Sequence, residues 1–417
     1  MKVFFDMVGC RLNQAEIDLF SLKYVSLGHE VVDNPADADL ILVNTCCVTK
    51  KASADSRKKI HKFQRETNAR VIAMGCWPSA MHDDAIKILS PKDLILNDEK
   101  FCLLDYSKID LTGIDEKPRL GSRNRTRAFV KVQDGCRNAC SFCLTTIARG
   151  QSRSIPAEQV ISYIQRLEIL GYKEIVLTGV QLGSWGKDFG LSTTIVDLIT
   201  QILSKTNIHR IRLSSIEPWD VSEELINLFS DKRLCNHLHI PIQSGSNNVL
   251  KAMRRPGNTS DLIKLFSMIN KKAPKINLSS DILVGFPGEE DDDFLQTVQL
   301  IKEIGLNDGH VFSFSPMPKT VAASLDKAVD PSMIKSRTQI IRNLLDELSK
   351  VYRNKQIGNV AEVLFESRLR IDENYYMSGL TETMQRVLVK STRNLSNHIC
   401  RVELIKQINN NKFIGKL

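Results

Sequence analysis

Three cysteines stand close together near the middle of the chain. Their order, Cys136, Cys140 and Cys143, is a C-x3-C-x2-C spacing directly after an apolar run that is expected to form a strand. Thiolates are soft ligands suited to iron–sulfur clusters, and such clusters usually take four of them. Three thiolates would leave one iron open to a small molecule. The amine and carboxylate of an amino acid could chelate that iron and receive an electron from it.

A zinc site is the alternative interpretation of this motif. Zinc normally takes a fourth cysteine or histidine nearby, commonly with a C-x2-C pair on each side. None of the eight histidines lies near this segment in the sequence. The spacing therefore favours an iron–sulfur cluster over zinc.

A second set of three cysteines is spread over the first hundred residues. Cys10, Cys46 and Cys76 each follow an apolar run of the kind that forms a buried strand. In open α/β sheets the carboxyl ends of parallel strands form the ligand crevice, so these thiols can converge in space. The alternative is that they are buried packing residues, which is common for free cysteine. Cys47, next to Cys46, leaves open which of the two thiols is the ligand.

The apolar pattern predicts an α/β protein of several domains. Strand-like runs alternating with amphipathic stretches over 1–98 predict a domain with a parallel sheet. Residues 99–126 are weakly periodic and are expected to form a linker. Six strands separated by helices over 127–354 predict a partial (β/α)6 barrel, whose chemistry sits at the carboxyl ends of the strands. Short β-rich runs over 355–417 predict a small all-β domain. The expected barrel strands cover 129–133, 174–177, 210–213, 237–242, 278–284 and 310–314.

The composition suits a cytoplasmic protein with a polyanionic partner. The sequence contains neither a signal peptide nor an apolar run long enough to span a bilayer, so no membrane partner is expected. In a reducing compartment, ten cysteines favour metal ligation or packing over disulfides. The formal charge is +9, and basic residues crowd two segments, 50–65 and 119–131. The first segment is either a solvated helix face or a contact for RNA.

The central motif resembles that of the radical S-adenosylmethionine (SAM) superfamily. The spacing matches, and Phe142 is the aromatic residue that often precedes the last cysteine. The resemblance implies a [4Fe–4S] cluster on Cys136, Cys140 and Cys143, which cleaves SAM reductively to give a 5′-deoxyadenosyl radical. It also implies SAM contacts from the residues that follow the barrel strands, although each could instead cap a helix or hold a loop. These candidates are Thr178, Gly179, Gln181, Ser215, Glu217, Gln243 and Ser244.

The whole chain resembles the methylthiotransferases within that superfamily. The motifs that carry the resemblance are Gly9-Cys10-Arg11-Leu12-Asn13-Gln14-Ala15-Glu16, Asn44-Thr45-Cys46-Cys47-Val48-Thr49 and Gly75-Cys76, followed by Ser214-Ser215-Ile216-Glu217-Pro218 and Pro241-Ile242-Gln243-Ser244-Gly245-Ser246. The run Ser378-Gly379-Leu380-Thr381-Glu382 is similar to the family's C-terminal TRAM module. The resemblance implies a second [4Fe–4S] cluster on Cys10, Cys46 and Cys76, which supplies or carries the sulfur, and two SAM molecules per turnover.

The amino-terminal motifs are most similar to the threonylcarbamoyladenosine group of this family. The implied reaction places a methylthio group on C2 of N6-threonylcarbamoyladenosine at position 37 of tRNA. The implied partners are the tRNA anticodon stem-loop, an electron donor such as flavodoxin or ferredoxin, and a sulfur donor. One departure concerns the substrate, because Met317 and Lys319 stand where relatives commonly have Arg and Gly.

Two other functions remain open from the sequence. A methylthiotransferase could act on isopentenyladenosine in tRNA or on a ribosomal protein aspartate. The chain could also be a non-catalytic iron–sulfur protein that binds RNA. The basic C-terminal region, with ten Lys or Arg against six Asp or Glu from Asn354 to Leu417, argues mildly against a protein substrate.

Overall fold

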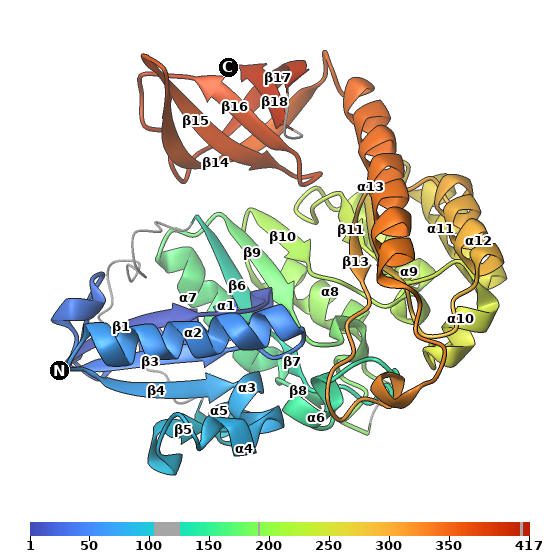
Figure 1. Ribbon diagram of the computed structural model, residues 1–417. Helices are drawn as coiled ribbons and strands as arrows, with labels where there is room; N and C mark the ends of the chain where they lie inside the picture. The colour runs from blue at the N-terminus through green and yellow to red at the C-terminus, as the bar shows by residue number, and fades with distance from the viewer. Residues whose placement is uncertain (104–125, 191, 409–411) are drawn as a thin grey trace.

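The computed structural model describes residues 1–103, 126–190, 192–408 and 412–417. A parallel-sheet domain, a central barrel and a small C-terminal β-barrel follow one another along the chain (Figure 1). This architecture confirms the fold class predicted from the sequence. No helix in these ranges combines the length and the apolar character that crossing a membrane requires.

The first domain is built on a five-stranded parallel sheet of order β2-β1-β3-β4-β5. The central strand, β3, has no exposed side chain, as expected for a mainly apolar strand that is covered on both faces of the sheet. Because β1, β3 and β4 are parallel neighbours, their carboxyl ends meet at one edge of the sheet. The strands are β1 (Lys2–Met7), β2 (Glu30–Val31), β3 (Leu40–Thr45), β4 (Arg70–Gly75) and β5 (Leu94–Ile95).

Helices connect the strands of this sheet. Thr49 begins the basic helix α2 by accepting a hydrogen bond from the backbone N–H of Ala52, which satisfies one of the free donors at the helix end. The helices are α1 (Arg11–Ser26), α2 (Lys50–Glu66), α3 (Cys76–Ala80), α4 (His82–Ala85) and α5 (Asn97–Leu103). Helix α5 covers the start of the expected linker 99–126. Residues 104–125 of that linker lie outside the described part of the chain.

The central domain contains the six expected parallel strands. They form two hydrogen-bonded sets of three, joined by a bridge between Ser215 and His239, so that the barrel is incomplete. The strands are β6 (Arg127–Lys131), β9 (Glu174–Thr178), β10 (Arg210–Leu213), β11 (His237–His239), β12 (Asn277–Val284) and β13 (Asp308–Ser313). A small antiparallel pair, β7 (Gln133–Asp134) and β8 (Arg153–Ser154), follows β6.

Amphipathic helices cover the outside of this barrel and bury their apolar faces against the strands. They are α7 (Ala157–Ile169), α8 (Ile195–Lys205), α9 (Glu223–Asn227), α10 (Asn247–Ala252), α11 (Thr259–Lys272) and α12 (Asp291–Glu303). The short helix α6 (Thr145–Arg149) packs against α3 of the first domain instead. Helix α1 of the first domain contributes Ile17 and Phe20 to the same apolar core as Val130 of β6. The first two domains therefore share one core.

A long helix, α13 (Pro331–Asn354), leads from the barrel to a closed five-stranded β-barrel (Figure 1). Buried Val363, Phe365 and Phe413 fill its interior. Arg212 of the central barrel donates to the backbone carbonyls of Thr381 and Glu382, which ties the two domains together. The strands are β14 (Val360–Ile371), β15 (Asn374–Thr381), β16 (Arg386–Lys390), β17 (Ile399–Ile408) and β18 (Lys412–Lys416).

Candidate active site

The central thiol set lies in the loop beyond the carboxyl end of β6. Cys136, Cys140 and Cys143 are all half-buried. The backbone N–H of Cys136 donates to the carbonyl of Gly150 at 3.0 Å, which fixes the start of the loop. Chain motifs that follow a barrel strand in this way place their side chains over the barrel mouth.

Backbone donors point at two of these sulfur atoms. The N–H of Asn138 lies 3.3 Å from Cys136 Sγ, and that of Thr145 lies 3.4 Å from Cys143 Sγ. Burial raises the pKa of Cys136 to about 11, although the Asn138 N–H opposes this shift. Donors aimed at sulfur stabilise the thiolate form that binds metal, and a bound cation supplies the remaining stabilisation. The loop therefore fits a thiolate-bound cluster.

The amino-terminal thiol set lies at one edge of the first sheet. Cys10 follows β1, Cys46 follows β3, and Cys76 begins α3 directly after β4. The loop of Cys10 lies against Cys46, because a Cβ added to Gly9 would come within 3.3 Å of Cys46 Sγ. Burial, followed by the neighbouring thiols of Cys76 and Cys10, raises the pKa of Cys46 to about 12. The donor set therefore suits a group that carries positive charge.

Cys46 and Cys47 differ in what their side chains contact. Cys47 has no exposed surface and packs in the apolar core of the first domain. Its thiol donates to the backbone carbonyl of Cys76 at 3.1 Å. Cys46 instead lies beside Gly9, next to Cys10. The geometry thus places Cys46 toward the loop of Cys10 and Cys47 within the apolar core.

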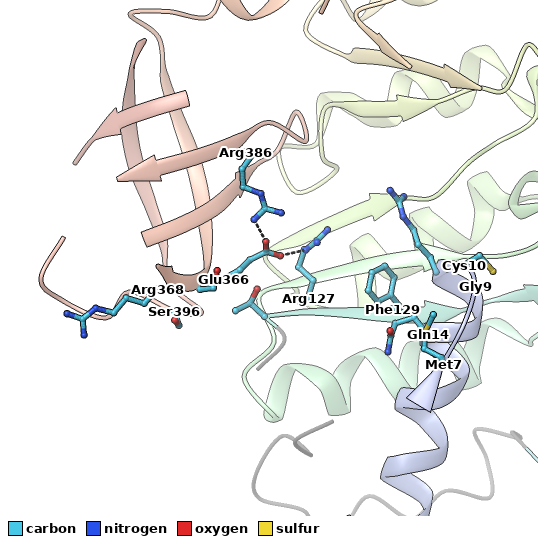
Figure 2. Close-up of a pocket in the computed structure, with 13 residues that line it drawn as sticks. Met7, Gly9, Cys10, Gln14, Arg127, Phe129, Glu366, Arg368, Arg386 and Ser396 are labelled. Carbon is cyan, nitrogen blue, oxygen red and sulfur yellow. Dashed lines mark hydrogen bonds and ion pairs between the residues drawn. The ribbon is translucent and has the colours of Figure 1, made fainter. Parts of the chain in front are cut away.

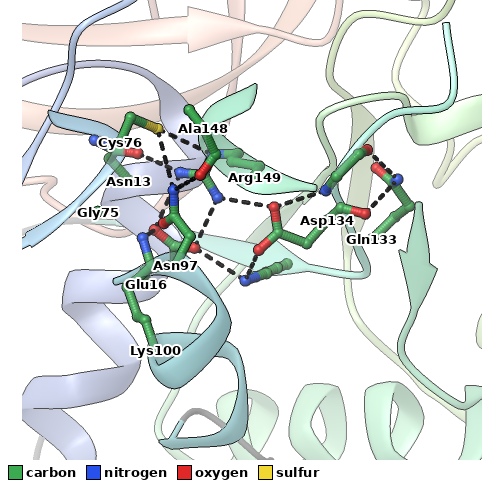
Figure 3. A network of polar contacts seen from close by, with 12 residues as sticks. Asn13, Glu16, Gly75, Cys76, Asn97, Lys100, Gln133, Asp134, Ala148 and Arg149 are labelled. Carbon is green, nitrogen blue, oxygen red and sulfur yellow. Dashed lines mark hydrogen bonds and ion pairs between the residues drawn. The ribbon is translucent and has the colours of Figure 1, made fainter. Parts of the chain in front are cut away.

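A buried network of charged residues lies beside Cys76 (Figure 3). Glu16 of α1 has no exposed surface and pairs with Lys100 at 2.7 Å, Lys131 at 2.9 Å and Arg149 at 3.0 Å. Asp134 pairs with Lys131 at 2.6 Å and with Arg149 at 2.9 Å. Burial alone would raise the pKa of Glu16, but the three cations hold it well below its ordinary value.

Arg149 connects the two thiol sets. Its Nε donates to Cys76 Sγ at 3.2 Å, and Asn97 Nδ2 lies 3.7 Å from the same sulfur (Figure 3). The next residue, Gly150, accepts the hydrogen bond from Cys136. Two consecutive residues thus contact the two motifs, Arg149 at Cys76 and Gly150 at Cys136.

Within the described ranges, no three His, Cys, Asp or Glu side chains are grouped closely enough to hold a single metal ion. An iron–sulfur cluster differs from a single ion because each of its iron atoms takes its own thiolate.

Comparisons with known proteins identify the family. Residues 130–301 match the radical SAM superfamily, and residues 2–97 match the uncharacterized protein family UPF0004. The threonylcarbamoyladenosine tRNA methylthiotransferase MtaB of Thermotoga maritima is 35% identical over 92% of this chain and 89% of its own length. The protein of the same name from Bacillus subtilis is 33% identical, with 97% and 94% coverage.

This chain belongs to the radical SAM methylthiotransferase family. The tRNA-2-methylthio-N(6)-dimethylallyladenosine synthase of Acetivibrio thermocellus, another member, is 30% identical over 92% of this chain and 82% of its own length. The fold is also similar to that of TsrM, a radical SAM methyltransferase from Kitasatospora setae, with a TM-score of 0.57 at 14% identity. That match covers 77% of this chain and 75% of TsrM. The family membership implies a [4Fe–4S] cluster and SAM for this methylthiotransferase.

Some of the candidate SAM contacts of the methylthiotransferase lie near the central thiols. Gln181 Oε1 is 3.4 Å from Cys136 Sγ. Glu217 pairs with Arg255 at 2.6 Å, and Arg255 opposes the rise that burial causes in the pKa of Cys140. Phe142 packs edge-on against the ring of Phe286, with centroids 6.5 Å apart.

The other candidates have different surroundings. Thr178 Oγ1 donates to the carbonyl of Val130 at 3.2 Å, and Ser244 Oγ lies 3.3 Å from Thr297 Oγ1. Both hydroxyls are therefore engaged within the protein. A Cβ on Gly179 would lie 2.8 Å from Gln133 Oε1, Ser215 is exposed, and Gln243 has a φ of 66°.

The loop that departs from the family pattern contacts the first domain. Lys319 Nζ donates to the carbonyl of Ala80 at 2.9 Å, and Met317 is buried in the same apolar cluster as Trp77. Both contacts involve helix α3, which begins with Cys76. The two unusual residues therefore hold a barrel loop against the helix that carries a candidate ligand.

Gly135→Ala is expected to remove the central cluster from the methylthiotransferase. Gly135 has a φ of 68°, and an added Cβ would lie 1.9 Å from the carbonyl oxygen of Gln151, so the Cys136 loop must move. Gly171→Ala is the matched control, because its φ is 78° and the added Cβ meets nothing within 4 Å. Both variants carry backbone strain of about 1 to 2 kcal/mol. Iron analysis after anaerobic reconstitution should show a loss for Gly135→Ala alone, and equal iron in both variants would contradict this.

Proposed function

We propose that this enzyme transfers a methylthio group to C2 of N6-threonylcarbamoyladenosine at position 37 of tRNA. The observation that carries the proposal is the pair of three-thiol sets, connected through Arg149 and Gly150. The names of the relatives at 33 to 35% identity support the threonylcarbamoyl substrate. The unactivated C2–H bond of adenine makes a radical route chemically reasonable.

Cys136, Cys140 and Cys143 would hold one cluster, and Cys10, Cys46 and Cys76 would hold the other. When bound, the first cluster supplies the electron that cleaves SAM, and the second supplies an open iron for the sulfur to be transferred. The chain's own residues position these groups. Arg149 donates a hydrogen bond to the sulfur of Cys76, and Gln181 and Glu217 are candidates to contact SAM beside Cys136 and Cys140.

The C-terminal domain is the proposed contact for RNA. We assign residues 355–417 to a TRAM-like module that binds the anticodon stem-loop, mainly through phosphates and loop shape. A net charge of +4 from Asn354 to Leu417 supports this assignment. The target base must leave its stack to reach the barrel, as in other enzymes that act on bases.

The same chemistry requires two further partners. We infer an electron donor such as flavodoxin or ferredoxin, because reductive cleavage of SAM consumes an electron. A sulfur donor must replace the atom that leaves with each product. The cytoplasm, where tRNA is modified, is the expected compartment.

A competition experiment tests the substrate. Reconstituted enzyme, SAM and reductant are incubated without oxygen with equal amounts of tRNA carrying threonylcarbamoyladenosine, tRNA carrying dimethylallyladenosine, and the ribosomal protein. Mass spectrometry of the digests should find the methylthio group on threonylcarbamoyladenosine. Product confined to either of the others would overturn the proposal. A fully loaded sample that forms no 5′-deoxyadenosine would favour the non-catalytic RNA-binding protein.

Cys46→Ala and Cys47→Ala form a matched pair that tests the ligand assignment. Cys46→Ala should lose the iron and sulfide of one cluster, because its thiol lies beside Cys10. Cys47→Ala should keep both clusters and lose about 1 kcal/mol of stability, as expected for a small buried group. Iron analysis and thermal denaturation measure both quantities. The reverse pattern of iron loss would make Cys47 the ligand.

A further inference from the structure

A cavity of about 730 Å³ lies where the three domains meet. Cys10 from the first domain, Phe129 from the central barrel and Glu366 from the C-terminal barrel all line it (Figure 2). Because Cys10 is a candidate ligand of the second cluster, the cavity opens directly onto the site proposed to deliver sulfur. Its size is that of pockets that hold small molecules.

The charge of this cavity favours an anion. Four arginines line it, Arg11, Arg127, Arg368 and Arg386, and Glu366 is the one acidic residue among its described lining residues. The formal charge of the lining is therefore +3. Positive charge collected in a concave site attracts oxyanions.

Three of the four arginines are already engaged. Glu366 pairs with Arg127 at 2.8 Å and also with Arg386 (Figure 2). Arg368 lies over the ring of Tyr375 at 3.9 Å and donates to the carbonyl of Thr392.

Arg11 is the exception. The residue is exposed, and it takes part in none of the hydrogen bonds or ion pairs seen among the described residues. Its guanidinium still has charged neighbours, because burial and the nearby Arg127 and Arg212 lower its pKa while Asp281 and Glu174 oppose that shift. Arg11 begins α1 immediately after Cys10, so its position is tied to that of the thiol. A guanidinium presents a planar fork that matches a carboxylate or a phosphate.

We propose that Arg11 binds the carboxylate of the threonylcarbamoyl substituent when this cavity receives the modified base. The inference rests on the proposed function. In adenine, C2 and the carbon that carries N6 both flank N1, so the substituent on N6 lies near the group that delivers sulfur to C2. Arg11 follows Cys10 in the chain and lines the same cavity, which puts its cation on the side where this substituent would lie. A dimethylallyl substituent is uncharged and would leave the cation without a partner, which disfavours it.

An RNA phosphate is the other source of an oxyanion, and a binding experiment separates the two. The probes are two anticodon stem-loops of identical sequence, one with threonylcarbamoyladenosine and one with plain adenosine. Affinities are measured by fluorescence anisotropy on cluster-loaded wild-type enzyme, on Arg11→Met and on Arg368→Met. The iron content of each variant confirms loading. Arg368→Met removes the same charge from the same cavity, but at a guanidinium that is already engaged.

Arg11→Met should weaken binding of the modified loop by roughly tenfold or more and leave the plain loop unchanged, since a hydrogen bond to a charged group is lost. Arg368→Met should keep the wild-type ratio of the two affinities. Equal weakening of both loops by Arg11→Met would assign Arg11 to a phosphate and overturn the proposal, as would no change in either.

The wild-type enzyme separates this inference from the proposed function. If it prefers and methylthiolates the modified loop while Arg11→Met binds normally, only the inference fails. If it neither prefers nor methylthiolates that loop, the proposed function fails with it.

Discussion

Cys140→Ala should abolish formation of 5′-deoxyadenosine from SAM, whereas Cys10→Ala should still form it and yet give no methylthio product. The two thiols belong to separate sets, on the loop after β6 and on the loop after β1. Loss of a thiolate from one set removes the cluster held there and spares the other. Chromatography of the quenched reactions measures 5′-deoxyadenosine and the modified nucleoside in the same sample.

The two variants control for each other, because each removes one thiol from an otherwise intact chain. Iron analysis should show that each retains one cluster. If Cys10→Ala failed to cleave SAM while retaining its central cluster, the separation of the two steps would be wrong. Formation of methylthio product by either variant would also contradict the assignment.

Glu16→Gln should destabilise the protein by about 3 to 5 kcal/mol, which is the usual effect of breaking a buried ion pair from one side. Glu16 has no exposed surface and faces Lys100, Lys131 and Arg149. The substitution leaves the three positive charges buried, with Asp134 as the remaining carboxylate of the network. Urea denaturation of the metal-free protein, followed by tryptophan fluorescence, measures the loss.

Glu66→Gln is the control for the same chemical change at the surface. Glu66 pairs with Lys62 one helical turn away at 3.8 Å, and both side chains are more than half exposed. Such pairs contribute about 0.3 to 0.5 kcal/mol. Similar losses for the two variants would mean that the network around Glu16 contributes little to stability.

Much of the fold follows from the sequence because most of the longer strands contain or adjoin a short apolar run. The six barrel strands and the strands at Lys2–Met7, Leu40–Thr45 and Arg70–Gly75 were all predictable in this way. The two-residue strand β5 also lies in a predicted apolar run, whereas β2 and the β7–β8 pair, also of two residues each, were not predicted. Such short strands carry no periodicity, and tertiary pairing alone creates them.

The candidate ligands were recognisable because cysteine spacing is itself a chemical signal. The charged residues around them were not. Lys100, Lys131 and Arg149 are buried, although lysine and arginine are usually at the surface. Arg149 meets Glu16 across 133 positions of sequence, so local pattern could not reveal the pair. Glu16 and Arg11 both lie within the sequence motif around Cys10, and this position was the only sign in the sequence that either residue belongs to the site.

The content of iron and acid-labile sulfide per chain, after anaerobic reconstitution of the wild-type protein, tests the central claim most directly. Two separate sets of three thiols predict enough of both elements for two [4Fe–4S] clusters, with spectra of the Cys10→Ala and Cys140→Ala variants that sum to that of the wild type. A fully loaded protein that holds iron for a single cluster, or a zinc ion in place of one, would contradict the account.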